Sequence, residues 1–217
     1  MRRDIVGSVV AIVVLTIGFG LVYPLVMTGV AQVTFKDQAN GSQVERNGKV
    51  VGSSLIGQDF RKPVLDAAGQ PKKDQDGNPV LEADPAWFQS RPSQSGYSAN
   101  VTFFSNLGPN QKDLADQVKA NLDAYVALER PFTPGLTAAG VPVDAVTSSA
   151  SGVDPHISAA NARIQANRIA AVRKAPLDRV LALIRGHTDG RSLGVLGEPG
   201  VNVLALNLAL DKEFPLR

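Results

Sequence analysis

The stretch IVGSVVAIVVLTIGFGLVYPLVMTGVAQVTF, residues 5–35, decides how this chain is organised. It contains no charged side chain, because Asp4 ends a charged leader and Lys36 is the next ionised residue. A bilayer core about 30 Å thick needs roughly 20 apolar residues in helical form, so the run can span it with some tilt. A single segment in lipid satisfies its own backbone hydrogen bonds only as a helix. We therefore predict one transmembrane anchor over residues 5–35.

The charges that flank this run predict its orientation. Arg2 and Arg3 lie directly before it, whereas only Lys36 and then Asp37 follow it. Basic residues are retained on the cytoplasmic side of a membrane. The sequence thus predicts a cytoplasmic leader over residues 1–4 and an extracytoplasmic domain over residues 36–217. In a bacterium, this would be a single-pass protein of the inner (plasma) membrane with a periplasmic or extracellular domain.

Two other interpretations of the apolar run remain open. A cleaved signal peptide would find its small residues at Gly29-Val30-Ala31, but its apolar core is usually only about 7–15 residues long. A buried helix of a soluble protein is the third interpretation. Tyr23 and Pro24 fit an interfacial aromatic residue and a helix end or kink, which favours a retained anchor.

Glycines in the run predict a surface for a partner helix. Gly7, Gly18 and Gly20 leave the helix open to close approach, as small residues often do where helices pack in membranes. Together with Tyr23 and Pro24 they form the candidate partner-binding face. The alternative is that glycine is simply frequent in such helices.

The composition restricts the classes of function. Among 217 residues there are 22 basic and 20 acidic side chains, a balance that argues against a nucleic-acid partner. The chain has no cysteine, which excludes disulfides, a thiolate nucleophile and a cysteine metal site. About 180 residues follow the anchor, enough for one domain with its own core.

The pattern along the exported part predicts a mixed α+β domain. Strands are expected within residues 49–57 and 141–147, and helices over 111–128, over 159–171 after a cap at Asp154 or Ser158, and from Pro176 to Gly186. Asn110 is expected to cap the first of these helices. The C-terminal run 195–211 is either an alternating strand or a strand at 201–204 that turns into a helix.

One proline-rich segment interrupts this pattern. Residues 61–85 contain four prolines and many charges without apolar periodicity, which predicts an exposed loop insertion with a small hairpin at residues 76–78. The only tryptophan, Trp87, follows at once, and we expect it in the core. The role of Arg91 is left open between a core contact and a binding surface.

No pattern of catalytic or metal-ligating residues emerges from the sequence. The G-x-S-x-G, Walker A and H-E-x-x-H motifs are absent, and His156 and His187 lack metal-ligand spacing. Ser151, Asp154 and His156 suggest a triad, but close neighbours at a helix start are more simply a capping cluster. We expect no catalytic residue, no metal and no intrinsic cofactor, which suits an accessory subunit of a membrane complex.

Several segments resemble one known family. The pieces are GSSLIGQDF, WFQSRPS, NLGPN, VPVDAVTSSASGVDPHIS, IQANRIAAVR and LGEPGVNVLALNLALD, in this order after an anchor that contains YPL. They are similar to the C subunit of the Kdp potassium-transporting ATPase, the KdpC family. This sequence departs from the family pattern at residues 62–84, a stretch that is longer than the pattern suggests.

The resemblance implies a non-catalytic subunit of a four-component bacterial potassium pump. Its partners would be a potassium-translocating A subunit, an ATP-hydrolysing B subunit of the P-type class and a small F peptide, with the potassium ion handled by these partners. The family is described as a catalytic chaperone that raises the affinity of the B subunit for ATP. On that account Gln165, with Ser149, Ser151 and Gly152 of the SSASG loop, would contact nucleotide.

The predicted topology opposes a direct contact of this kind, because ATP is cytoplasmic and residues 36–217 are expected outside. We therefore favour a role in assembly and stability, with the anchor on the A subunit and the outer domain over the ion entrance. The alternative is a membrane-anchored periplasmic binding or hydrolase domain that is unrelated to transport.

Overall fold

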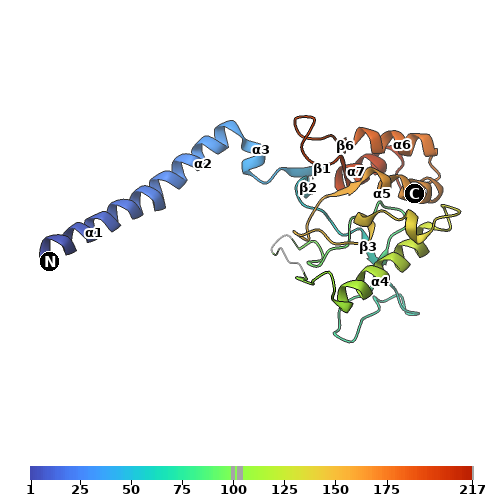
Figure 1. Ribbon diagram of the computed structural model, residues 1–217. Helices are drawn as coiled ribbons and strands as arrows, with labels where there is room; N and C mark the ends of the chain where they lie inside the picture. The colour runs from blue at the N-terminus through green and yellow to red at the C-terminus, as the bar shows by residue number, and fades with distance from the viewer. Residues whose placement is uncertain (99–100, 102–104, 217) are drawn as a thin grey trace. The chain divides into compact units, whose positions relative to one another are not determined.

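Two compact units make up the chain, Met1–Ser53 and Ser54–Arg217 (Figure 1). The computed structural model describes residues 1–98, 101 and 105–216. Helices and strands both occur among these residues, which confirms the predicted mixture of helix and sheet.

A continuous helix over Arg2–Thr34 dominates the first unit (blue in Figure 1). By length and composition it is the one helix in the described part of the chain that could cross a membrane. It consists of α1 (Arg2–Ile17), the π-turn η1 (Gly18–Val22) and α2 (Tyr23–Thr34). Pro24 has no N–H and its ring crowds the carbonyl one turn back, which explains why the turn before it is widened.

A short helix and a hairpin complete this unit. Helix α3 (Lys36–Ala39) leads into strands β1 (Gln43–Arg46) and β2 (Lys49–Ser53), which pair antiparallel. The turn residues Asn47 and Gly48 both have positive φ, as a two-residue hairpin turn requires. The strand expected within residues 49–57 is therefore present as β2, whereas its partner β1 was not predicted.

A second hairpin opens the larger unit. Strands β3 (Arg61–Pro63) and β4 (Leu81–Ala83) pair antiparallel, and residues 65–79 between them are exposed. The carboxylate of Asp74 accepts hydrogen bonds from the backbone of Asp76 and Asn78, which forms the tight turn expected there. That the segment is an insertion stays a prediction.

Helix α5 (Ala159–Arg173) contacts both α4 (Lys112–Glu129) and α6 (Leu177–Gly186), and α6 contacts α7 (Val203–Glu213). Three short strands, β5 (His156–Ser158), β6 (Thr188–Asp189) and β7 (Gly200–Asn202), form an antiparallel sheet in the order β5-β7-β6.

The main core lies where α5, α6 and α7 meet the central strand β7. It consists of Phe88 and of buried side chains from these elements and from β5, among them Ile157, Ile169, Val180, Val201, Leu206 and Leu210. A smaller cluster joins Tyr125 of α4 to Leu136, Ala145 and Val146. Alanines at 162 and 166 of α5 are fully buried, so this helix can approach its neighbours closely.

Three local predictions are wrong. Residues 141–147 form no strand: they follow the 3₁₀ turn η2 (Ala138–Gly140) and contain the 3₁₀ turn η3 (Val143–Ala145), because Pro142 fixes φ and its carbonyl closes a turn with Ala145. Trp87 is only half-buried, and Phe88 beside it is the fully buried core residue. The residue that precedes α4 is Gln111, without a side-chain cap from Asn110.

The two helix starts around the sheet follow from local chemistry. Ser158 caps α5 as predicted, because its hydroxyl accepts a hydrogen bond from the Asn161 N–H at 3.1 Å. Asn202 likewise caps α7 by accepting from the Ala205 N–H at 3.0 Å. Of the two interpretations of the C-terminal run, the strand that turns into a helix is confirmed.

Candidate functional site

The polar face of α5 is the most unusual feature of the larger unit. Asn161, Gln165 and Arg168 recur at helical spacing and are at most 1% exposed. A buried polar group costs stability unless it is hydrogen-bonded, so each of these side chains needs partners inside the protein.

Arg168 forms a fully buried ion pair with Glu129 at the end of α4. Its Nε lies 2.9 Å from Glu129 Oε1, and its Nη1 donates to the carbonyls of Pro85 and Trp87 at 2.6 and 3.0 Å. Glu129 Oε2 is buried and has no hydrogen-bond partner among the described residues. Burial raises the pKa of the Glu129 carboxyl, although Arg168 opposes this effect. The pair connects α4, α5 and the segment 85–87.

Gln165, the predicted nucleotide contact, uses all four hydrogen bonds of its amide inside the protein. Its Oε1 accepts from the Gln89 N–H at 2.7 Å and from Arg168 Nη2 at 3.0 Å. Its Nε2 donates to the Gln89 carbonyl at 3.1 Å and to Asn161 Oδ1 at 2.9 Å. In this arrangement, Gln165 positions the backbone of Gln89. Its role toward nucleotide stays a prediction.

The other predicted nucleotide residues lie together in the loop 148–152. The Ser149 hydroxyl accepts from the Gly152 N–H at 3.0 Å, and the Ser151 hydroxyl accepts from the Val153 N–H at 3.2 Å. Gly152 has φ +71°, a left-handed conformation that glycine adopts without strain. Ser151 is exposed, whereas Gly152 is buried.

The segment 89–93 connects this loop to Gln165. Gln89 bonds Gln165 as described, while Ser93 Oγ donates to the Gly152 carbonyl at 2.6 Å. Between them, Arg91 donates to the Ser148 carbonyl at 3.3 Å and to Asp154 Oδ2 at 3.2 Å. Arg91 therefore joins two parts of the larger unit, and a role in a binding surface stays a prediction.

A partly exposed charge cluster lies at the start of β5. His156 Nε2 is 3.1 Å from Asp189 Oδ2, and His156 Nδ1 is 3.7 Å from Asp154 Oδ1. Asp154, followed by Asp189, raises the pKa of His156, and the same contact with His156 lowers the pKa of Asp154. The cluster therefore links the two outer strands, β5 and β6, across the central strand β7.

Ser151 does not complete a triad with these two residues. Among the described residues no hydrogen bond joins Ser151 to His156, whose ring contacts carboxylates on both sides. Within the same residues no group of three or more His, Cys, Asp or Glu side chains could hold a metal ion.

The predicted partner-binding residues lie along the apolar helix of the first unit. Gly18 lies eleven positions after Gly7, which brings the two within about 20° on the helix, whereas Gly20, two positions further on, lies on roughly the opposite side. Gly7 and Gly18 thus share one face and Gly20 does not. No side chain lies within 4 Å of where a Cβ on either would be. Tyr23 is exposed and begins α2, and Pro24 lies in the first turn of that helix.

Comparison with known proteins identifies the family. A family model described as KdpC, "K+-transporting ATPase, c chain", matches residues 5–212. The chain belongs to the KdpC family. The resemblance drawn from the sequence segments is therefore confirmed.

Curated members of the KdpC family match over almost their whole length. The potassium-transporting ATPase KdpC subunit of Rhodospirillum rubrum is 46% identical over 218 residues, which cover 100% of this chain and 99% of the relative. The subunit of Bradyrhizobium diazoefficiens is 45% identical, with 98% of each chain covered. That of Mycobacterium tuberculosis is 42% identical over 214 residues, with 98% and 100% covered.

Sequence reasoning missed two residues that organise this KdpC-family fold. Glu129 is the buried partner of Arg168, and Asp144 accepts hydrogen bonds from the Ser158 N–H and from Asn161 Nδ2 at 2.8 and 2.9 Å. No local pattern marks either residue, because their partners lie 39 and 14 or 17 positions away. Only a map of contacts between distant segments would reveal them.

Proposed function

We propose that the chain is a non-catalytic accessory subunit of an ATP-driven potassium uptake complex. The observation that carries this proposal is the family match over residues 5–212, together with full-length relatives that are named as subunits of a potassium-transporting ATPase. The buried polar network supports it, because its side chains bond one another and the backbone rather than open onto a reactive cavity.

The partners in this proposal are the potassium-translocating A subunit, the ATP-hydrolysing B subunit and the F peptide of the Kdp complex. The apolar helix anchors the chain in the inner membrane, and the face of Gly7 and Gly18 packs on a partner helix. The larger unit lies on the extracytoplasmic side, in accord with the basic residues Arg2 and Arg3 before the span.

A modulatory role without direct nucleotide contact fits the residues better than ATP binding by this chain. The amide of Gln165 bonds Gln89, Asn161 and Arg168, so a ligand could bind it only by displacing one of these contacts. An extracytoplasmic unit would also lie across the membrane from cytoplasmic ATP. An effect on the ATP affinity of the B subunit would then pass through subunit contacts.

Growth at limiting potassium tests the proposed function. In a strain that lacks other potassium uptake systems, deletion of this chain is expected to prevent growth at low potassium, and the full-length chain on a plasmid should restore it. Excess potassium is the control, because both strains should then grow equally. Undiminished growth of the deletion strain at low potassium would overturn the proposal.

Reporter fusions at the C-terminus test the orientation separately. Alkaline phosphatase, which is active only outside the cytoplasm, is expected to be active there, and green fluorescent protein is expected to stay dark. The opposite pair of signals would place the larger unit in the cytoplasm and favour direct contact with ATP.

A further inference from the structure

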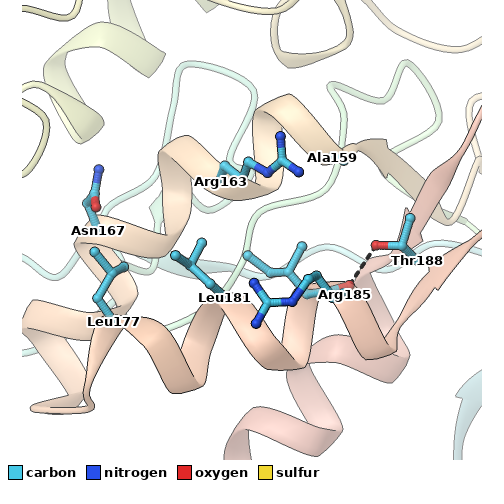
Figure 2. A pocket seen from close by; sticks show the side chains of 8 residues that line it. Ala159, Arg163, Asn167, Leu177, Leu181, Arg185 and Thr188 are labelled. Atoms are coloured by element: carbon cyan, nitrogen blue, oxygen red, sulfur yellow. Dashed lines mark hydrogen bonds between the residues drawn. The ribbon is translucent and has the colours of Figure 1, made fainter.

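A groove lies between α5 and α6 on the surface of the larger unit (Figure 2). Its volume is about 590 Å³, and it is lined by Ala159, Arg163, Asn167, Leu177, Leu181, Ile184, Arg185 and Thr188. It is separate from the buried network on the other face of α5. The proposed function makes no use of it.

The walls of the groove carry two cations that have no anionic partner in the described part of the chain. Of the arginines on α5 and α6, three bind carboxylates: Arg168 with Glu129, Arg173 with Asp211 and Arg179 with Glu213. Arg163 and Arg185 are exposed and form no ion pair within the residues that the structure describes. Figure 2 shows Arg163 on α5 and Arg185 on α6, on opposite sides of the groove.

The floor of the groove is aliphatic. Leu177, Leu181 and Ile184 recur at i, i+4 and i+7 on α6, and Leu177 is 41% exposed. This stripe extends about 10 Å along the helix at 1.5 Å per residue, which is about two turns of a partner helix. None of the described residues that line the groove is acidic. The site therefore combines a short apolar stripe with positive charge on both sides.

We propose that this groove docks a short amphipathic helix of a partner polypeptide, with aliphatic side chains on Leu177 and Leu181 and carboxylates on Arg163 and Arg185. Charge complementarity selects an acidic segment, and the helical spacing of the stripe suits recognition of a helix in a groove. The shortness of the stripe favours such a helix over a lipid acyl chain. This inference rests on the proposed function, because the partner belongs to the same membrane assembly.

Site-specific photo-crosslinking tests the docking site in the full-length chain. The crosslinking amino acid p-benzoylphenylalanine replaces Leu177 or Arg163 in cells, and mass spectrometry identifies the attached peptide. Both positions are expected to capture the same membrane-subunit segment, in which Asp or Glu lies within one helical turn of aliphatic residues. Ala120, exposed on α4, is the control position and should capture no such segment.

Charge reversal provides the second measurement. With the crosslinker at Leu177, the double change Arg163→Glu and Arg185→Glu should lower the yield by about tenfold or more, because like charges would face each other. Replacing the acidic residue of the captured segment with Lys should restore the crosslinking yield of the double variant. The thermal unfolding of the double variant should shift only slightly, since neither arginine has an ion-pair partner to lose among the described residues and the one cost is a carboxylate in the last turn of α6.

Three outcomes would overturn the docking site. They are a captured segment without acidic residues, crosslinks to lipid alone, and a yield that the charge reversal does not change. If the membrane subunits co-purify but neither position captures a peptide, the groove proposal alone fails. If the chain purifies without any membrane subunit, the proposed function fails first.

Discussion

In the larger unit, two residues of opposite charge are buried against each other. Arg168 and Glu129 are both 0% exposed, and the guanidinium also binds two carbonyls that follow the proline-rich hairpin. Breaking a buried pair is costly because the remaining charge has no water to solvate it. The pair therefore acts as a junction between α4, α5 and the segment 85–87.

Glu129→Gln tests this junction. The variant leaves the Arg168 charge uncompensated and should lower the free energy of unfolding by about 3–5 kcal/mol. The fluorescence of Trp87, the only tryptophan, reports unfolding of this unit in denaturant. Glu198→Gln is the matched control, since that carboxylate pairs with Arg191 on the surface and contributes less than about 1 kcal/mol. Equally small changes in both variants would mean that Glu129 is not ionised in the folded protein.

His156 should make stability depend on pH. Its pKa is raised by Asp154 and Asp189, so its contribution is fully present below the unfolded pKa of about 6.5 and is lost as the pH rises through the folded pKa. The pKa of Asp154 is lowered, so its contribution is lost only as the pH falls through that lower value. The window of stabilisation lies between these two limits.

The difference in unfolding free energy between the wild type and His156→Gln measures this contribution. This difference should be smaller at pH 8.5 than at pH 5.5. The decrease should be less than about 1 kcal/mol, because the ring is about one-third exposed and solvent screens its partners. In the Asp189→Asn background this difference should depend less strongly on pH, because one of the two carboxylates that raise the pKa of His156 is then neutral. A difference that grows with pH would contradict the assignment.

Among the elements, helices were more predictable than strands. The apolar stripe of α6 and the Ser158 cap of α5 lie in the local sequence, so both helices begin and end close to their expected limits. The strands contain only two to five residues, too few for alternation to define them. Residues 141–147 look like a strand by β-branched content, but Pro142 directs them into a turn. The site depends on pairs such as Glu129 with Arg168, which no local pattern encodes.

The segment that leads from the first hairpin into the larger unit should be sensitive to added volume at Gly57. A Cβ there would lie 2.5 Å from Tyr97 Cε1 and 2.7 Å from the Asp154 carbonyl oxygen. Gly57→Ala should therefore cost about 1–3 kcal/mol of unfolding free energy. Gly186→Ala, at the end of α6 with no atom within 4 Å of its Cβ, should change stability by no more than about 1 kcal/mol. Equal effects of the two variants would contradict this packing.

The apolar helix should bind its partner through the face of Gly7 and Gly18. Gly18→Leu fills the space into which a second helix would fit, so recovery of membrane subunits with the tagged chain should fall several-fold. Val9→Leu enlarges an exposed residue about 180° away from Gly18 and should leave the recovery unchanged. Equal losses in the two variants would show that the glycines do not define the interface.

In the whole molecule, the two units have different parts in the proposed function. The first contains the one helix among the described residues that could cross a membrane, and the second has its own core, buried network and surface groove. The family match extends over both units, from residue 5 to residue 212. We therefore propose that this chain functions as part of an assembly with other subunits.

Purification of the tagged full-length chain from native membranes in mild detergent tests that claim most directly. We predict that a potassium-translocating subunit and a P-type ATPase subunit elute with it in fixed proportion, as identified and quantified by mass spectrometry. Elution of the chain without either subunit, from membranes in which both are present, would contradict the account.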